Sequence, residues 1–269
     1  MKRSGWLGIY AVAYLVFLYA PVVLLPLFAF NDATIIAFPL SGFTTEWFAQ
    51  LATIEALHDS VINSLYIAVS TAILATCFGV FAARASSRYD FPAKRGIMGF
   101  IMIPLVLPEI IIAVALLVVL LQLGIALSAW TVILGHVLLC TPFSIAILNS
   151  AFLAMDRSLE EAAYDLGETR WSAFRLITLP LVMPGIVSSL LISFTISLDE
   201  FIIAFFLTGN EPTLPVYLWS QLRFPQKIPV VMALGTILLA ASLILLTTAE
   251  YFRRRGVART GAKDTGGFL

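Results

Sequence analysis

The sequence predicts an all-α integral membrane protein with six transmembrane helices, and three observations support this fold class. The 269 residues are 60% hydrophobic and only 12% charged, whereas soluble domains carry about 25% charged residues. The mean hydropathy of +0.98 is too high for one soluble core. Uncharged stretches recur along the chain, and a helix of about 20 apolar residues crosses a bilayer. A soluble enzyme, a nucleic-acid-binding protein and a disordered regulator are therefore excluded.

The boundaries of the six spans follow from the charges and from one turn signal. Gly124 supplies a turn that divides the long uncharged run 110–155. Three acidic residues lie within spans without ending them: Glu109, Asp199 and Glu200. The expected spans are 7–29, 61–83, 97–121, 129–151, 184–207 and 229–251.

The basic residues orient these spans. With the N-terminus inside, 14 of the 16 Lys and Arg residues fall in cytoplasmic segments, and only Arg223 and Lys227 fall in external loops. Cytoplasmic loops of membrane proteins are enriched in Lys and Arg, so both termini are expected in the cytoplasm. A single transmembrane domain is expected over 1–255. The Gly-rich, charged tail 256–269 is expected to be cytoplasmic and disordered.

The cytoplasmic segment 156–184 is predicted to form a helix–turn–helix hairpin. Ser158 and Glu161 have the spacing of a capping box, in which both side chains accept hydrogen bonds from backbone N–H groups. Gly167 lies where a left-handed C-cap ends such a helix. Two prolines are expected to end the second helix and to start the fifth span, Pro180 and Pro184.

The same hairpin carries a family resemblance. Glu161-Ala162-Ala163, three residues, Gly167, nine residues and then Ile177-Thr178-Leu179-Pro180 resembles the EAA motif of type I ABC importer permeases in its spacing and in all its fixed letters. The alternative is an incidental capped amphipathic hairpin. The resemblance implies the MetI-like permease fold and a hairpin that docks on an ATPase subunit. The coupling residues are then Ser158, Glu161, Ala162, Ala163, Gly167, Ile177, Leu179 and Pro180.

The chain lacks a nucleotide-binding motif of its own. It contains no Gly-Lys pair, and so no Gly-x4-Gly-Lys-Ser/Thr loop to hold ATP phosphates. We therefore expect no catalytic residues, no bound cofactor, and ATP and Mg used by two separate ATPase subunits. The resemblance also implies a second, homologous permease, a periplasmic or extracellular solute-binding protein and a bacterial cytoplasmic (inner) membrane. No nucleic-acid partner is expected.

The acidic residues within the spans indicate the kind of solute. Ionisable groups inside a membrane are costly and are functional candidates by default, and no Lys or Arg lies at comparable depth. An acidic pathway suits a cationic solute, to which aromatic rings add cation–π contacts. The candidate pathway residues are Asp199, Glu200, Glu109, Phe201, Tyr217 and Trp219.

Each of these residues also has a structural interpretation. Glu109 follows Pro108 and is expected at the start of a broken half-helix, and the alternative is that it only caps this half-helix. Asp199 and Glu200 are alternatively partners of the second permease, and Trp219 an interfacial belt residue. His136 and Cys140 share a helix face as metal ligands can, but a third ligand is missing, so no metal site is expected.

Short motifs around the acids are similar to those of spermidine and putrescine permeases. They are Leu107-Pro108-Glu109-Ile110, Ser197-Leu198-Asp199-Glu200, Thr208-Gly209 and Thr213-Leu214-Pro215. The sequence is thus interpreted as half of the translocation pathway of an ATP-driven polyamine importer. One alternative is import of another small organic solute, such as an opine or an amino-acid-like compound. The other is an ion-coupled secondary transporter.

Overall fold

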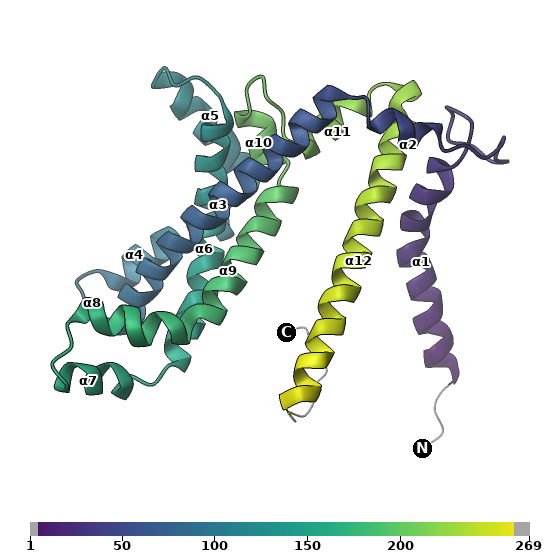
Figure 1. The fold of residues 1–269 in the computed structure, drawn as a ribbon. Coiled ribbons are helices and arrows are strands. Elements are labelled where there is room, and N and C mark those ends of the chain that lie inside the picture. Colours follow the sequence, from purple (N-terminus) through teal and green to yellow (C-terminus); the bar gives the residue numbers. More distant parts are fainter. Residues whose placement is uncertain (1–4, 261–269) are drawn as a thin grey trace. The chain divides into compact units, whose positions relative to one another are not determined.

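The computed structural model describes residues 5–260, with side chains described for residues 6–244 and for Thr247. Its regular elements in that range are helices, and they form two compact units (Figure 1). We call residues 1–54 together with 218–269 the terminal unit, and residues 55–217 the central unit.

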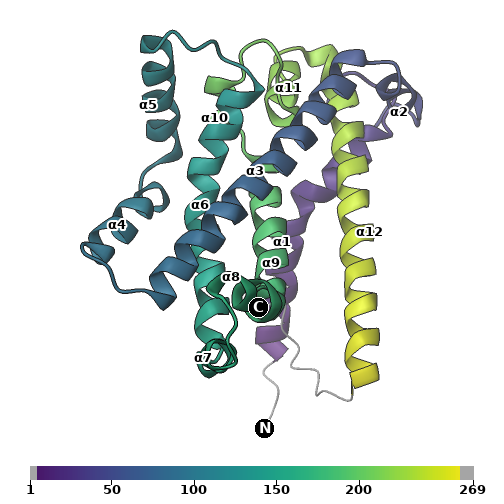
Figure 2. The same ribbon diagram turned by 60° about the vertical axis from the view of Figure 1, so that its left-hand side comes forward.

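The terminal unit pairs its two long helices. The helices α1 and α12 run side by side in both views (Figures 1 and 2), and a Cβ atom at Gly235 would lie 3.6 Å from Leu25 Cδ2. The Trp47 indole donates a hydrogen bond of 2.8 Å to the Asn31 carbonyl, which fixes the loop between α1 and α2. The helices of this unit are α1 (Gly5–Ala29), α2 (Glu46–Leu51), η3 (Pro225–Lys227) and α12 (Ile228–Thr260).

The end of α12 corrects one expectation. The helix continues to Thr260, so residues 256–260 are helical rather than part of a disordered tail. Alanine and arginine in this stretch are good helix formers, which offsets the cost of Gly256. The remainder of the expected tail, residues 261–269, lies outside the described residues.

The central unit is built on three long helices, α3, α6 and α9, that pack against one another (Figure 2). The unit begins with α3 (Glu55–Arg88), α4 (Lys94–Ile101), η1 (Ile103–Leu105), α5 (Glu109–Gln122) and α6 (Ala129–Ala154). It continues with α7 (Ser158–Asp165), α8 (Arg170–Ala173), η2 (Phe174–Thr178), α9 (Leu179–Asp199) and α10 (Ile202–Leu207). The helix α11 (Leu214–Gln221) crosses into the terminal unit.

Small and hydroxyl-bearing residues bring these three helices close together. A Cβ atom at Gly79 of α3 would lie 2.7 Å from Ser144 Cβ on α6. The hydroxyls of Ser144 and Ser193 are 2.9 Å apart and join α6 to α9. Within a bilayer, close backbone approach and interhelical hydrogen bonds stabilise helix pairs, because apolar side chains gain nothing by leaving lipid.

Within the described residues, five helices are long and apolar enough to cross a membrane: Trp6–Ala29, Glu55–Arg88, Ala129–Ala154, Arg170–Asp199 and Pro225–Ile244. The continuous span expected over 97–121 is wrong, because that stretch is divided into α4, η1 and α5. Pro104 and Pro108 explain the division, since proline lacks an N–H donor and clashes with the preceding turn.

The fifth span also differs from the expectation of one helix over 184–207. Pro180 and Pro184 do not separate the hairpin from the span, because Arg170–Asp199 is continuously helical with wider π turns over Phe174–Thr178. Pro180 lies in the first turn of α9, where the missing donor is tolerated. The helix then ends early, since Glu200 has an extended backbone (ψ 122°).

Replacing Gly79 by Ala should destabilise the central unit by about 1–3 kcal/mol, because the added methyl group overpacks a closed helix contact. Thermal unfolding of the purified protein in detergent measures the effect. Gly99→Ala in α4 is the matched control, since nothing lies within 4 Å of its Cβ position. Equal melting temperatures for the two variants would show that the α3–α6 contact is not tight.

Candidate functional site

The turn of the hairpin 156–184 has the predicted conformation. Gly167 has φ +87°, in the left-handed region. Its N–H donates to the Tyr164 carbonyl at 3.0 Å, and the Glu168 N–H donates to the Ala163 carbonyl at 3.0 Å. This pair of bonds is the Schellman motif that closes a helix C-terminus. The left-handed C-cap expected at Gly167 is therefore confirmed.

The start of α7 differs from the expected capping box. Arg157, not Ser158, occupies the N-cap position and has helical dihedral angles. The Ser158 N–H donates to Asp156 Oδ1 at 3.0 Å, so an aspartate outside the helix satisfies this donor. The same hydrogen bond lowers the pKa of the Asp156 carboxyl below its usual value, because the backbone N–H stabilises the charged form. Ser158 and Glu161 are both exposed.

The hairpin is anchored by a residue that sequence reasoning missed. Glu160 is buried, and its Oε2 atom lies 3.0 Å from Arg88 Nε at the end of α3. The Thr178 hydroxyl donates to the other carboxylate oxygen, Oε1. The available signal was spacing, since Glu160 is three residues before the buried Ala163 and so shares the inner face of α7. Glu160 thus ties α7 both to α3 and to the start of α9.

The residues of the EAA-like motif divide between anchor and surface. Ala163 is buried, and Ile177 and Leu179 are partly buried. Five other members are exposed, namely Ser158, Glu161, Ala162, Gly167 and Pro180. Ser158, Glu161 and Ala162 lie on α7 and Gly167 closely follows it, whereas Pro180 lies in α9. Through Glu160, α7 is joined to the rest of the central unit. Their contact with an ATPase stays a prediction.

The break between α9 and α10 places two neighbouring acids differently. Glu200 is buried and accepts hydrogen bonds from the Ile203 and Ala204 N–H groups at 3.0 and 3.1 Å. Its Oε2 atom also lies 3.2 Å from His136 Nε2 on α6. Ser197 completes the network, with its hydroxyl 2.7 Å from His136 Nδ1. Glu200 therefore caps α10 and bonds to the core of the central unit.

Asp199 is the last residue of α9, and it is exposed. A carboxylate at a helix C-terminus faces the negative end of the helix dipole, and no salt bridge to Asp199 is found within residues 5–260. Glu109 is also exposed but begins α5 after Pro108, as predicted, where the dipole favours an anion. Asp199 therefore lacks the local stabilisation that Glu109 and Glu200 have.

The three aromatic candidates belong to two different segments, the start of α10 and the helix α11. The Phe201 ring lies beside the break, with its centroid 5.5 Å from that of Phe205. Tyr217 is partly buried in α11. Trp219 is exposed and belongs to the terminal unit. Phe201 directly follows the two acids at the α9–α10 break, and a contact of any of these residues with a solute stays a prediction.

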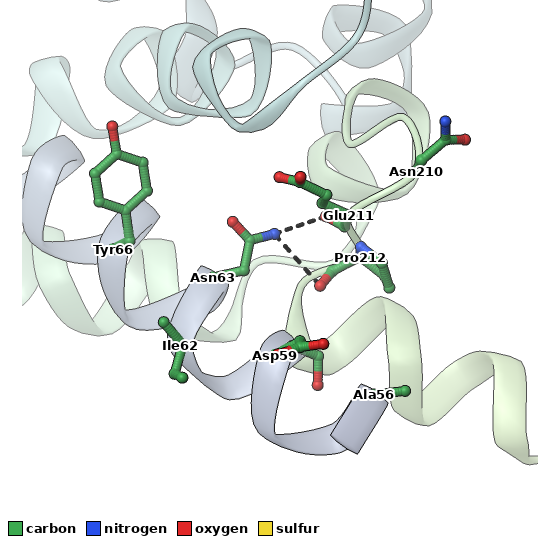
Figure 3. Close-up of a pocket in the computed structure, with 9 residues that line it drawn as sticks. Ala56, Asp59, Ile62, Asn63, Tyr66, Asn210, Glu211 and Pro212 are labelled. Atoms are coloured by element: carbon green, nitrogen blue, oxygen red, sulfur yellow. Dashed lines mark hydrogen bonds between the residues drawn. The ribbon is translucent and has the colours of Figure 1, made fainter. Parts of the chain in front are cut away.

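A cavity of about 480 Å³ lies between the first turns of α3 and the loop after α10 (Figure 3). The Asn63 amide donates to the Glu211 carbonyl at 2.6 Å, and the Leu214 N–H donates to the Ser64 hydroxyl at 2.7 Å, so the loop is fixed to α3. The residues that line the cavity are Ala56, Asp59, Ser60, Ile62, Asn63, Tyr66, Asn210, Glu211 and Pro212.

The charge of this cavity is uniformly negative. Asp59 and Glu211 are both exposed, and no Lys or Arg is among the lining residues. Figure 3 shows the Asn63, Tyr66 and Glu211 side chains directed toward the same space. Sequence reasoning did not single out these residues, although both acids fall in segments predicted to be external. The cavity offers carboxylates and an aromatic ring but no cationic group.

The comparisons agree with this architecture. Residues 75–256 match the family model described as "Binding-protein-dependent transport system inner membrane component". The "Spermidine/putrescine transport system permease protein PotC" of Shigella flexneri is 33% identical over 269 residues, which cover 99% of this chain and 97% of that protein. The "Putrescine transport system permease protein PotI" of Escherichia coli (strain K12) is 35% identical over 262 residues, covering 94% and 92%.

A solved structure has the same fold. It is a chain of a bacterial ABC transporter involved in the import of the acidic polysaccharide alginate, with a TM-score of 0.72 and 17% identity, covering 94% of this chain and 99% of that one. The family match extends over more than half of the sequence, and both relatives align over nearly the whole of it. The chain therefore belongs to the family of inner membrane components of binding-protein-dependent transport systems, the multi-pass permeases of ABC importers.

Proposed function

We propose that this chain forms half of the translocation pathway of an ATP-driven importer for a polyamine such as putrescine or spermidine. One observation carries the proposal: the exposed acids of the central unit, Asp199, Asp59 and Glu211, have no basic partner among the described residues. The names of the two relatives, which specify spermidine and putrescine, support the same class of solute.

A polyamine matches the chemistry of these groups. Each ammonium group is a compact cation with several N–H donors, which suit carboxylate oxygens. The Tyr66 ring beside Glu211 adds a surface for a cation–π contact. The end of α9 gives the Asp199 carboxylate no electrostatic stabilisation. A cationic solute that passes this point supplies that stabilisation. Glu200 contributes indirectly, since it holds the α9–α10 break at which Asp199 lies.

The partners follow from the hairpin and the family. Two ATPase subunits, which bind ATP and Mg, dock on the exposed face of α7 of this chain and of a second, homologous permease. A solute-binding protein delivers the polyamine on the outer side, and this chain itself catalyses no reaction. Glu160 joins α7 to the start of α9, and Arg170–Asp199 is one continuous helix about 45 Å long. A displacement of α7 is therefore transmitted along this helix to Asp199.

The membrane arrangement belongs to the same proposal. The protein lies in the bacterial cytoplasmic (inner) membrane with both termini inside, as the distribution of its basic residues favours. The family match runs from residue 75 to residue 256, across both compact units, which supports one permease domain over 1–255.

The proposal is tested by the ATPase activity of the purified complex in lipid, with its own binding protein, titrated with putrescine and spermidine. Stimulation by either polyamine is expected, because solute delivery drives the ATPase subunits together through the hairpins. Stimulation only by an opine or an amino-acid-like compound would support the assignment as an importer and exclude a polyamine as its solute. An intact preparation without an associated ATPase would instead favour an ion-coupled secondary transporter.

Replacing Asp199 by Asn should lower polyamine uptake into proteoliposomes roughly tenfold, because a charge-assisted hydrogen bond contributes about 1.5–3 kcal/mol. The complex should still assemble, since Asp199 is exposed and forms no salt bridge within residues 5–260. Asp90→Asn is the matched control, as this exposed acid pairs only with Lys94 on the same surface. Uptake by D199N equal to that of the control would return Asp199 to a structural role.

Replacing Gly167 by Val should abolish transport while the protein still inserts in the membrane, because a β-branched residue is strained at φ +87°. Nothing lies within 4 Å of the Cβ position, so backbone strain alone is tested. Gly167→Asn is the companion variant, since Asn tolerates the left-handed region, and it should retain most of the uptake. Full uptake by G167V would show that the turn geometry does not matter for coupling.

A further inference from the structure

A second cavity, of about 190 Å³, lies between the end of α3 and the hairpin. Four arginines line it, Arg84, Arg88, Arg157 and Arg170, and they face only two acids, Glu160 and Glu161. Two tyrosines complete the wall, Tyr89 and Tyr164. It is therefore a basic pocket, opposite in charge to the cavity at the other end of α3.

Two of the arginines are already occupied. Arg88 pairs with the buried Glu160, so these two charges cancel in the net charge of the pocket. The guanidinium of Arg157 donates to the Ser87 carbonyl and so caps the last turn of α3. Both side chains hold the pocket in shape, because each joins the hairpin region to α3.

The other two arginines, Arg84 and Arg170, have side-chain donors that are free to bind an anion. The Arg84 guanidinium stacks on the Phe174 ring at 4.2 Å, and its buried Nε atom has no hydrogen-bond acceptor. Arg170 is exposed, and no carboxylate lies within salt-bridge distance of it in the described part of the chain. Arg84 and Arg170 therefore bring two positive charges to the pocket that form no salt bridge among the described residues.

The pocket continues into an apolar cavity of about 380 Å³ that shares Arg84, Tyr89 and Arg170 with it. The additional lining residues are Phe81, Ala85 and Trp171. Phe81 and Trp171 are each 68% exposed, although both are large apolar side chains. Phe81 lies three residues before Arg84 on α3, so the two side chains share one side of this helix, which is long and apolar enough to cross a membrane.

We propose that this pair of cavities binds an anionic phospholipid of the cytoplasmic leaflet. Arg84 and Arg170 hold the phosphate of the headgroup, and one acyl chain lies against Phe81 and Trp171. Basic pockets beside the cytoplasmic ends of membrane helices suit anionic headgroups, and aromatic side chains suit the interface. Because exposed apolar side chains adjoin the arginines, a lipid fits both halves of the site, whereas a free phosphate fits only one.

The site has a consequence for the hairpin. Arg170 begins α8, and Arg84 lies on α3, so a phosphate held between them adds a link between these two elements. This link is separate from the one that Arg88 and Glu160 make. A bound lipid would therefore fix α8 in place while the exposed face of α7 stays accessible.

The experiment measures the lipid that stays bound to the intact importer complex. The complex is reconstituted in mixed phosphatidylglycerol and phosphatidylcholine, extracted in detergent, and analysed by mass spectrometry for retained lipid. Wild type should retain phosphatidylglycerol in preference to phosphatidylcholine. In the double variant Arg84→Gln/Arg170→Gln this preference should fall by roughly tenfold or more, because two basic contacts to an anionic headgroup are removed.

The control and companion variants keep the test decisive. Arg175→Gln removes an exposed charge from the same continuous helix but lines neither cavity, and it should retain the wild-type preference. Arg84→Lys/Arg170→Lys keeps both charges and should retain most of it. If R84Q/R170Q does not fold, Arg170→Gln alone replaces it, because that side chain is exposed, and it should lose part of the preference.

Three results would overturn the proposal. The first is an unchanged phosphatidylglycerol preference in R84Q/R170Q or, where that variant does not fold, in R170Q. The second is complete displacement of the lipid by inorganic phosphate, which would identify a free-anion site. The third is loss of the ATPase subunits from the double variant with lipid retention intact, which would assign the arginines to ATPase docking. The readout does not involve the transported solute, so it stands or fails independently of the polyamine assignment.

Discussion

The central unit depends on the side chain of Glu200. A helix that ends within a membrane exposes backbone N–H groups where no water can satisfy them. Glu200 accepts two of these donors at the start of α10, and it also contacts His136 on α6. The interruption of the α9–α10 chain is therefore stable, and it leaves Asp199 exposed at the end of α9. Without this cap, the backbone N–H groups at the start of α10 would lack acceptors, and the break would not have a fixed geometry.

The hairpin end of the central unit is stabilised in the same way, by a buried acid that contacts several elements. Glu160 contacts Arg88 on α3 and Thr178 at the start of α9, so the hairpin is attached to two of the three central helices. A buried ion pair is costly to break from one side, by about 3–5 kcal/mol. The hairpin is therefore firmly attached to α3 and to the start of α9. Fold alone does not set solute charge, since a protein that imports an acidic polysaccharide shares it.

Short sequence patterns predicted the structural features that depend only on neighbouring residues. The left-handed turn at Gly167 and the half-helix that begins at Glu109 follow from glycine and proline geometry, and both are present. The burial of Glu160 and Glu200 was not predicted, because their partners lie on α3 and α6, far away in sequence. Hydropathy alone also joined residues 97–121 into one span, since apolar composition does not register the interruption made by two prolines.

The length and charge of α3 have a consequence for the energised membrane. Its 34 residues extend about 51 Å, beyond the roughly 30 Å of the hydrocarbon layer. Acidic residues lie in its first turns and arginines in its last, so the helix carries opposite charges at its two ends. The proposed orientation puts these arginines inside, and an inside-negative potential favours that orientation by about 2.3 kcal/mol per charge moved across 100 mV. In the proposed orientation, the membrane potential therefore opposes any outward displacement of α3.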